Sequence, residues 1–312
     1  MKKSLLLIVA LLASLSAWAQ NAPALGDLFY SDGTFSSTLV EGKTPIGVVA
    51  YLGSDSFSEN GVTLRDGVTT LNSYGLVLCL KNAADNVQWS TVSGNCDLGD
   101  EAAISTANDN DLMRSTDVSG YTNTNTLVQK NASNYPAATA AWNYADLEAP
   151  TNTTGWFLPS IQQWVRILMG LGEMSESSAR WNVQFDTNPI DKLNTAMEKA
   201  GEGNCTLISG NNVAYWSSSE DSRYEYRYST CLDSRNGGYY FAAYLKNAAY
   251  TSYPARVRPI LAFSYEEDTP TGIVDLNAVQ PKSGQRYNLM GQPVGKDYKG
   301  IVIEDGKKLI VR

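Results

Sequence analysis

The sequence contains no histidine, and this absence excludes more chemistry than any other feature of its 312 residues. Without imidazole there is no Ser-His-Asp or Cys-His nucleophile pair, no histidine-ligated zinc or haem, and no histidine pH switch. The remaining acid and base material consists of adjacent acidic residues such as Glu220-Asp221, which we interpret as solvated loop charges. Adjacency does not place two carboxylates on either side of a sugar. The sequence therefore predicts a protein that is not an enzyme and that needs no cofactor.

Basic residues are also in short supply, with 24 Lys and Arg against 32 Asp and Glu and a net charge of -8. They form no cluster, whereas phosphate contacts require clustered Lys and Arg, so we expect no nucleic-acid partner. No glycine-rich phosphate loop occurs, and the tract around Asp109 and Asp111 lacks the glycine and terminal glutamate of an EF-hand. We therefore predict neither a nucleotide site nor a metal site.

Long apolar runs are confined to the N-terminus. Lys2-Lys3 precedes an apolar run over Leu5–Ala13, and Ala17-Trp18-Ala19 places small residues around a large one. This pattern is typical of a secretory signal peptide, residues 1–19, that is cut after Ala19. No later stretch approaches the roughly 20 apolar residues of a membrane-spanning helix, so we expect a secreted protein without a transmembrane segment.

Cysteine is scarce as well, with four residues and no Cys-x-x-Cys spacing that would suit zinc. Because export takes the chain to an oxidising compartment, disulfides can persist there. We favour the two pairs that are local in the sequence, Cys79 with Cys96 and Cys205 with Cys231. Unpaired structural thiols are the alternative.

Strand patterns occupy both ends of the body. The turn at Asp32-Gly33 and the apolar run Ile46–Tyr51 predict a hairpin. Gly75–Leu80 predicts a buried strand, and the alternating Val87–Ser90 is expected to be its partner. Further strands are expected at Ala214–Trp216, Tyr239–Tyr244 and Val257–Phe263.

Helix patterns lie between these strands. Ser160 precedes apolar residues at helical spacing, and Pro189 after Asn188 opens a second helix that Gly201 closes. A shorter helix is expected near Tyr135 to Leu147, and the Asn-, Ser- and Thr-rich tracts around it are expected to be loops. The fold class is therefore α+β, with two main helices against antiparallel strands and long loops.

Composition changes across residues 266–271, a charged linker with proline and glycine. Residues 272–312 carry seven basic and four acidic side chains, so this tail is basic whereas the body is acidic. Short strands are expected at Tyr287–Leu289, Gly300–Ile303 and Lys308–Val311, with Asp305-Gly306 as a hairpin turn. A tail of roughly 40 residues is too short for a core of its own, so we expect it to dock or to be recognised.

Aromatic and basic side chains gather over residues 215–258. Tyrosine rings stack on apolar sugar faces and guanidinium groups donate hydrogen bonds, so this region is the candidate ligand-binding surface. The candidate residues are Tyr224, Tyr226, Arg227, Arg235 and Tyr239. Four other aromatic residues are expected to be core, namely Trp156, Trp164, Trp216 and Phe241.

Three segments match a known pattern: Gly155–Ser160 followed by Trp164, Tyr215–Glu220, and Arg256–Pro259. With them the body resembles the Fibrobacter succinogenes major paralogous domain family, which is related to the C-terminal domain of the Legionella collagen-like adhesin. This resemblance implies a C-type-lectin-like fold for residues 20–265. The tail resembles the C-terminal sorting domains of Bacteroidetes, which implies recognition by the secretion machinery.

The resemblance and the composition together favour a secreted or surface-displayed, non-catalytic binding or adhesion module. Its ligand would be a glycan or an extracellular protein. A structural subunit of a cell-surface assembly is the alternative. An enzyme of the formylglycine-generating type, which has a similar fold, comes third, because Phe157 stands where that group has arginine.

Overall fold

The computed structural model describes residues 22–92, 94–96, 98, 117–209, 212–221, 228–247, 255–265, 286–288, 292–304 and 307–311. They fall into two compact units, one within Ala22–Glu266 and one formed by the C-terminal residues after it. The predicted signal peptide at 1–19 and linker at 266–271 lie outside the described residues, so these boundaries stay predictions. Among the described residues, no helix combines the length and the apolar character needed to cross a membrane.

The body is mixed α and β, as expected. Its strands are β1 Leu28–Tyr30, β2 Phe35–Ser36, β3 Pro45–Leu52, β4 Gly75–Cys79, β5 Val213–Asp221, β6 Tyr228–Arg235, β7 Gly238–Leu245, β8 Ala255–Arg256 and β9 Ile260–Phe263. Its α-helices are α2 Gly120–Asn131, α3 Pro136–Trp142, α4 Ile161–Gly170 and α5 Pro189–Glu198, with 3-10 turns at Ser56–Ser58, Ala132–Asn134 and Glu176–Ser178.

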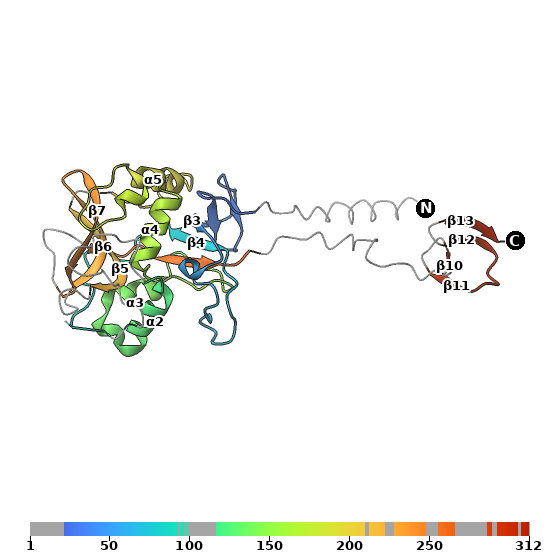
Figure 1. Cartoon of the computed structure of the whole chain (residues 1–312), viewed down its shortest axis with the longest axis horizontal. Coiled ribbons are helices and arrows are strands. Elements are labelled where there is room, and N and C mark those ends of the chain that lie inside the picture. The colour runs from blue at the N-terminus through green and yellow to red at the C-terminus, as the bar shows by residue number, and fades with distance from the viewer. Residues whose placement is uncertain are drawn as a thin grey trace. The chain divides into compact units, whose positions relative to one another are not determined.

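Two sheets organise the body. The first has the order β2-β1-β3-β4-β9 and is antiparallel throughout, and the second has the order β7-β6-β5-β8, in which β8 is parallel to β5. Helix α4 packs against β3 of the first sheet and β5 of the second, and Figure 1 shows it between them. Helix α2 packs on α3 and β5, while α5 packs on α4 and β3.

The second sheet separates two apolar clusters. Along β5, Val213 and Tyr215 face the larger cluster, whereas Ala214 and Trp216 face the smaller one. This alternation follows from the two-residue period of a strand. The four aromatic residues expected to be core are at most 2% exposed, so that prediction is confirmed: Trp156, Trp164, Trp216 and Phe241.

The prediction that residues 87–90 form a strand beside β4 was wrong. Residues 87–90 form no strand, and β4 lies between β3 and β9, which comes from the far end of the body. The N–H of Val87 donates to the carbonyl of Ala255 at 2.9 Å, and the N–H of Ser90 donates to that of Lys246 at 3.0 Å. Strand β9, which is distant in the sequence and has four buried apolar residues, therefore pairs with β4. The alternating pattern of Val87–Ser90 had predicted that pairing for residues 87–90.

The two main helices are confirmed. Helix α4 begins after Ser160, whose hydroxyl accepts from the N–H of Gln163 at 3.3 Å, while the Gln163 side chain accepts from the N–H of Ser160 at 2.9 Å. This reciprocal pair is a capping box. Helix α5 begins with Pro189, and Gly201 beyond its end has a φ of 87°. Helix α3 also begins with its proline, but it ends at Trp142 rather than near Leu147.

Helix α2 was expected to be a loop, because Asn and Thr are poor helix formers. Side-chain hydrogen bonds, within the helix and to residues outside it, offset this preference. The hydroxyl of Thr124 donates to the carbonyl of Gly120 at 2.7 Å and accepts from the N–H of Leu158 at 3.1 Å. The amide of Asn123 donates to the buried carboxylate of Asp117 at 3.0 Å. Contacts to the rest of the body therefore maintain a helix that local propensity does not favour.

All four cysteines have free thiols, so the favoured disulfide pairs were wrong. Cys79 lies in β4 within the larger cluster and Cys231 lies in β6 within the smaller one, each fully buried. Burial raises the pKa of the Cys79 thiol to about 12. These two cysteines act as small apolar core residues, which agrees with the alternative of unpaired thiols.

The tail forms a four-stranded antiparallel sheet of order β11-β10-β12-β13, with β10 Arg286–Asn288, β11 Pro293–Val294, β12 Gly300–Glu304 and β13 Lys307–Val311. The expected strands are confirmed, and their turn at 305–306 lies outside the described residues. Val302 is fully buried, whereas Ile310 is 72% exposed. The docking or recognition expected of the tail stays a prediction.

Replacing Gly120 with alanine should destabilise the body although alanine is the better helix former. A Cβ at this position would lie 2.8 Å from the backbone nitrogen of Ser160 and 2.9 Å from the carbonyl oxygen of Leu158, and neither atom can move freely. We expect Gly120→Ala to lower the free energy of unfolding by about 1–3 kcal/mol in urea denaturation. Thr122→Ala on the exposed face of the same helix is the control and should be nearly neutral. Equal stability of Gly120→Ala and the wild type would contradict the packing described here.

Candidate functional site

Two of the five predicted site residues fall within the described part of the chain. Arg235 ends β6 and Tyr239 lies in β7, directly beyond the Asn236-Gly237 turn. The other three, Tyr224, Tyr226 and Arg227, lie outside the described residues, so their roles stay predictions.

Arg235 and Tyr239 point to different sides of their sheet. Tyr239 is half-buried and packs against the larger apolar cluster, and this burial raises the pKa of its hydroxyl. Its neighbour Tyr240 takes the position beside Arg235, whose guanidinium carbon lies 4.6 Å from the centre of the Tyr240 ring. Tyr240 therefore lies on the same side of the sheet as Arg235 and Tyr239 on the other, and the ligand-binding role predicted for Arg235 and Tyr239 stays a prediction.

The residues around this stack hold it in place. Arg235 donates to the side-chain oxygen of Asn182 at 2.9 Å and pairs with the buried carboxylate of Asp233 at 3.4 Å. The hydroxyl of Tyr240 donates to the side-chain oxygen of Gln184 at 2.9 Å. The result is a fixed face of aromatic and polar groups, which we call the Arg235–Tyr240 face.

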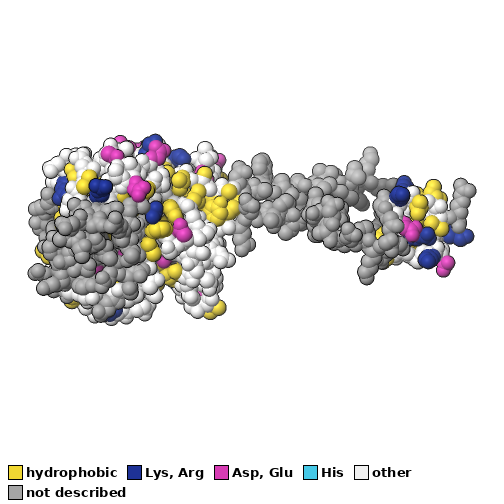
Figure 2. All heavy atoms as spheres, viewed as in Figure 1, with side chains coloured by type: hydrophobic (Ala, Val, Ile, Leu, Met, Phe, Trp, Pro, Cys, Tyr) yellow, Lys and Arg dark blue, Asp and Glu magenta, His cyan; other side chains and the backbone are white. Residues whose placement is uncertain are grey.

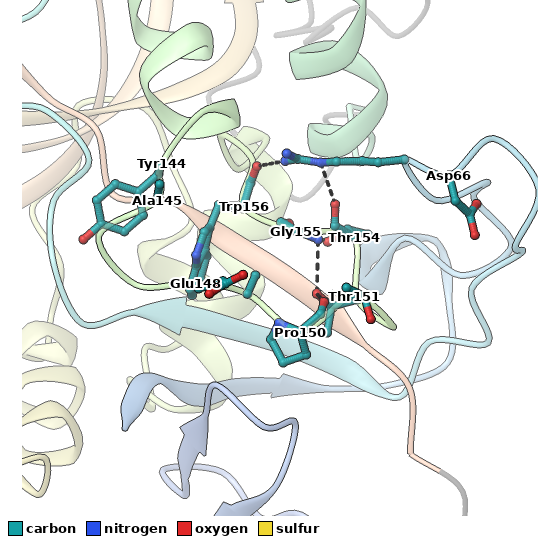
Figure 3. Close-up of a pocket in the computed structure, with 12 residues that line it drawn as sticks. Asp66, Tyr144, Ala145, Glu148, Pro150, Thr151, Thr154, Gly155 and Trp156 are labelled. Carbon is teal, nitrogen blue, oxygen red and sulfur yellow. Dashed lines mark hydrogen bonds between the residues drawn. The ribbon is translucent and has the colours of Figure 1, made fainter. Parts of the chain in front are cut away.

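A concave site lies elsewhere in the body, between the turn at 65–66 and the loop 144–156. It encloses about 710 Å³. Figure 3 shows Trp156 and Glu148 between Tyr144 on one side and Asp66 on the other. The lining residues are Arg65, Asp66, Tyr144, Ala145, Glu148, Ala149, Pro150, Thr151, Thr153, Thr154, Gly155 and Trp156. We refer to this site as the loop pocket.

Arg65 fixes one wall of the loop pocket. It donates to the carbonyl oxygens of Thr154 at 3.0 Å and Trp142 at 2.8 Å, and also to that of Trp156. Its guanidinium carbon lies 3.7 Å from the centre of the Trp142 ring. Gly155 makes this position possible, because it has a φ of 67° and a Cβ there would lie 2.9 Å from the guanidinium carbon. Because Gly155 has no Cβ, the guanidinium group of Arg65 can pack against it.

The polar groups of the loop pocket divide into two kinds. The hydroxyls of Thr153 and Thr154 donate to the carbonyls of Pro150 and Gly155, so they stabilise the loop. Glu148 and Thr151 are exposed and are available to a ligand, whereas Asp66 is exposed but already accepts hydrogen bonds within its own turn. Hydrogen bonds from the Thr69 hydroxyl and from the N–H groups of Val68 and Thr69 lower the pKa of Asp66, so it stays ionised in mild acid. The pocket thus presents hydrogen-bond acceptors within a fixed frame.

Sequence reasoning missed the loop pocket. Arg65 and Glu148 lie far apart in the chain, and neither stands in a motif that indicates binding. The one signal in the sequence was Gly155, which belongs to a motif. Its positive φ, which favours glycine, is visible only in the structure.

Glu220 and Asp221 were expected to be solvated loop charges, and this was wrong, because both lie in β5 and are at most 3% exposed. Across the described ranges, no group of three or more Asp, Glu or Cys side chains is placed to hold a metal ion.

Comparison with known proteins gives little further identification. No family model matches the chain, and no curated protein matches it. Among solved structures it is similar to a fimbrial protein from Bacteroides ovatus ATCC 8483, with 16% identity and a TM-score of 0.49. The match covers 77% of this chain and 49% of that chain, so this chain spans about half the length of the fimbrial protein. A TM-score of this size does not establish a shared fold.

Replacing Arg65 with lysine should weaken the frame of the loop pocket. An ammonium group cannot reach three carbonyl oxygens in the planar geometry of a guanidinium group. We expect Arg65→Lys to lower the free energy of unfolding by roughly 1–2 kcal/mol, measured by urea denaturation. Arg180→Lys at an exposed position provides the matched control and should change little. If both variants lose the same stability, Arg65 does not have the role assigned to it.

Proposed function

We propose that this protein is a non-catalytic binding module, secreted or displayed at the cell surface, that binds a glycan in the loop pocket. The observation that carries the proposal is the pocket itself, a concave site of about 710 Å³ built from loops on a closely packed body. Loops on a rigid support are a common location for binding sites.

The polar groups of the loop pocket suit a ligand with many hydroxyl groups. The carboxylates of Glu148 and Asp66 accept hydrogen bonds, and the hydroxyl of Thr151 can both donate and accept. Sugars offer donors and acceptors at this density, whereas a purely apolar ligand would make no hydrogen bond with the carboxylate of Glu148. The two acidic groups also disfavour a strongly anionic glycan, because like charges repel at close range.

The same groups support binding rather than catalysis. A general acid must be protonated near the working pH, whereas the hydrogen bonds to Asp66 favour its ionised form. The sequence offers no imidazole in its place. We therefore propose no reaction at this site, and the formylglycine-generating type of activity remains the least favoured interpretation.

The wider proposal rests on the sequence. The resemblance to the Fibrobacter-type family supports a C-type-lectin-like arrangement of the body, and the tail's resemblance to sorting domains supports surface display through the secretion machinery. On the coloured part of the body in Figure 2, basic side chains are scattered among acidic ones.

The alternative is a structural subunit of a surface assembly, or a module with a protein ligand, and one observation favours it. The Arg235–Tyr240 face offers a fixed aromatic ring with an arginine beside it, and both residue types are enriched at protein interfaces. Val183 next to it is 38% exposed and adds apolar surface.

The proposal predicts binding of the mature full chain to a glycan array, with and without calcium. Glu148→Ala should weaken binding to the glycan found there by about tenfold, because it removes a charged acceptor at an exposed position without disturbing the core. Thr151→Ala should have a smaller effect of the same sign. Glu41→Ala removes another exposed carboxylate, which does not line the pocket, and should leave binding unchanged. Affinity would be measured by titration calorimetry.

Other outcomes would change the assignment. Binding that Arg235→Ala abolishes and Glu148→Ala leaves intact would move the site to the Arg235–Tyr240 face. A folded protein that binds no glycan and forms concentration-dependent oligomers would favour the structural subunit.

A further inference from the structure

The body buries an amine against a carboxyl group. Lys246, directly after β7, is 0% exposed, and Glu220 of β5 is 3% exposed. The Nζ atom of Lys246 is in direct contact with Oε1 of Glu220, and the Trp89 ring lies 4.7 Å from this nitrogen. Most charged residues of a protein remain in water, so a pair enclosed in this way requires a physical reason.

The neighbours of the pair are those that an amide group needs. The backbone N–H of Cys96 donates to both carboxyl oxygens of Glu220, at 3.0 and 3.2 Å. Nζ of Lys246 donates to the carbonyl oxygen of Gly94 at 2.9 Å and lies 3.6 Å from the Cys96 sulfur. An amide joining the two side chains would keep a donor for its C=O in Cys96 and an acceptor for its N–H in Gly94.

We propose that Lys246 and Glu220 become joined by an intramolecular isopeptide bond. A proton first passes from the ammonium group to the carboxylate, which gives a neutral amine and a carboxylic acid. The lone pair of Nζ then attacks Cδ of Glu220, so the Nζ–Cδ bond forms. The Cδ–OH bond breaks, and the hydroxyl group leaves as water with a second proton from Nζ. No electron is gained or lost, and no co-reactant is needed.

Burial favours each part of this reaction. Proton transfer within the pair removes two charges from a buried site, where ions are poorly hydrated. The fixed contact gives the two groups a high effective concentration. The N–H of Cys96 points at the carboxyl oxygens, where negative charge develops during the attack, and stabilises it. The amide product then leaves no charge buried.

The bond would connect β5 with the end of β7 across the intervening strand β6. It would close a covalent loop over residues 220–246 and hold the second sheet together independently of its hydrogen bonds. Such a cross-link suits a module exposed to pulling forces, but the proposal does not depend on the loop pocket or on its ligand.

Mass spectrometry of the mature full chain tests the proposal. The denatured protein should weigh less than its sequence by one water molecule, and trypsin should fail to cleave after Lys246. Fragmentation should find one branched peptide that contains both Glu220 and Lys246. Glu220→Ala and Lys246→Arg should each restore the mass of the sequence. The exposed pair Lys192–Glu173, at 3.0 Å, is the internal control and should give separate peptides.

The wild-type chain decides the outcome even if the variants fold poorly. A full sequence mass, with Glu220 and Lys246 recovered on separate unmodified peptides, would overturn the proposal and leave an ion pair. A mass raised by oxygen at Cys96, with the two peptides still separate, would overturn it as well.

Discussion

The body depends on one constraint, which is that β5 carries five consecutive polar residues, Ser217–Asp221, through the interior, where all are at most 3% exposed. A buried polar group without a hydrogen bond is costly, so each neighbouring element must supply a partner. Trp89 donates to the carbonyl of Ser217 at 2.7 Å, and Asn123 of α2 donates to the hydroxyl of Ser218 at 3.3 Å. The first N–H of α4, at Ile161, donates to the hydroxyl of Ser219 at 2.9 Å.

These hydrogen bonds explain the positions of the surrounding elements. The segment 87–90 does not extend the first sheet, because the indole N–H of Trp89 donates to the backbone of β5. Helix α2 exists in spite of its composition because Asn123 and Thr124 are held by β5 and by the Gly155–Ser160 segment. The N-terminus of α4 meets β5 as well, so a single strand fixes both helices and the loop that contains Cys96.

The sequence was informative where the determining interaction is local. A capping box, a proline at the first helical position and a run of apolar residues act within one element, so α4, α5 and β4 were predictable. It misled where a partner comes from far away in the chain, as at α2, at residues 87–90 and at Glu220. The loop pocket belongs to the second kind, because Arg65 and Gly155 meet only once the body has folded.

The residues of the three sequence motifs, 155–160, 215–220 and 256–259, stabilise the interior. Phe157 and Trp216 are buried, Gly155 admits Arg65, and Arg258 is buried and donates to the carbonyls of Cys79 and Thr206 at 2.9 and 2.6 Å. The groups that can meet a ligand, Glu148 and Thr151, stand outside those motifs. The motif residues therefore stabilise the body, whereas exposed loop side chains are the groups that a ligand can reach.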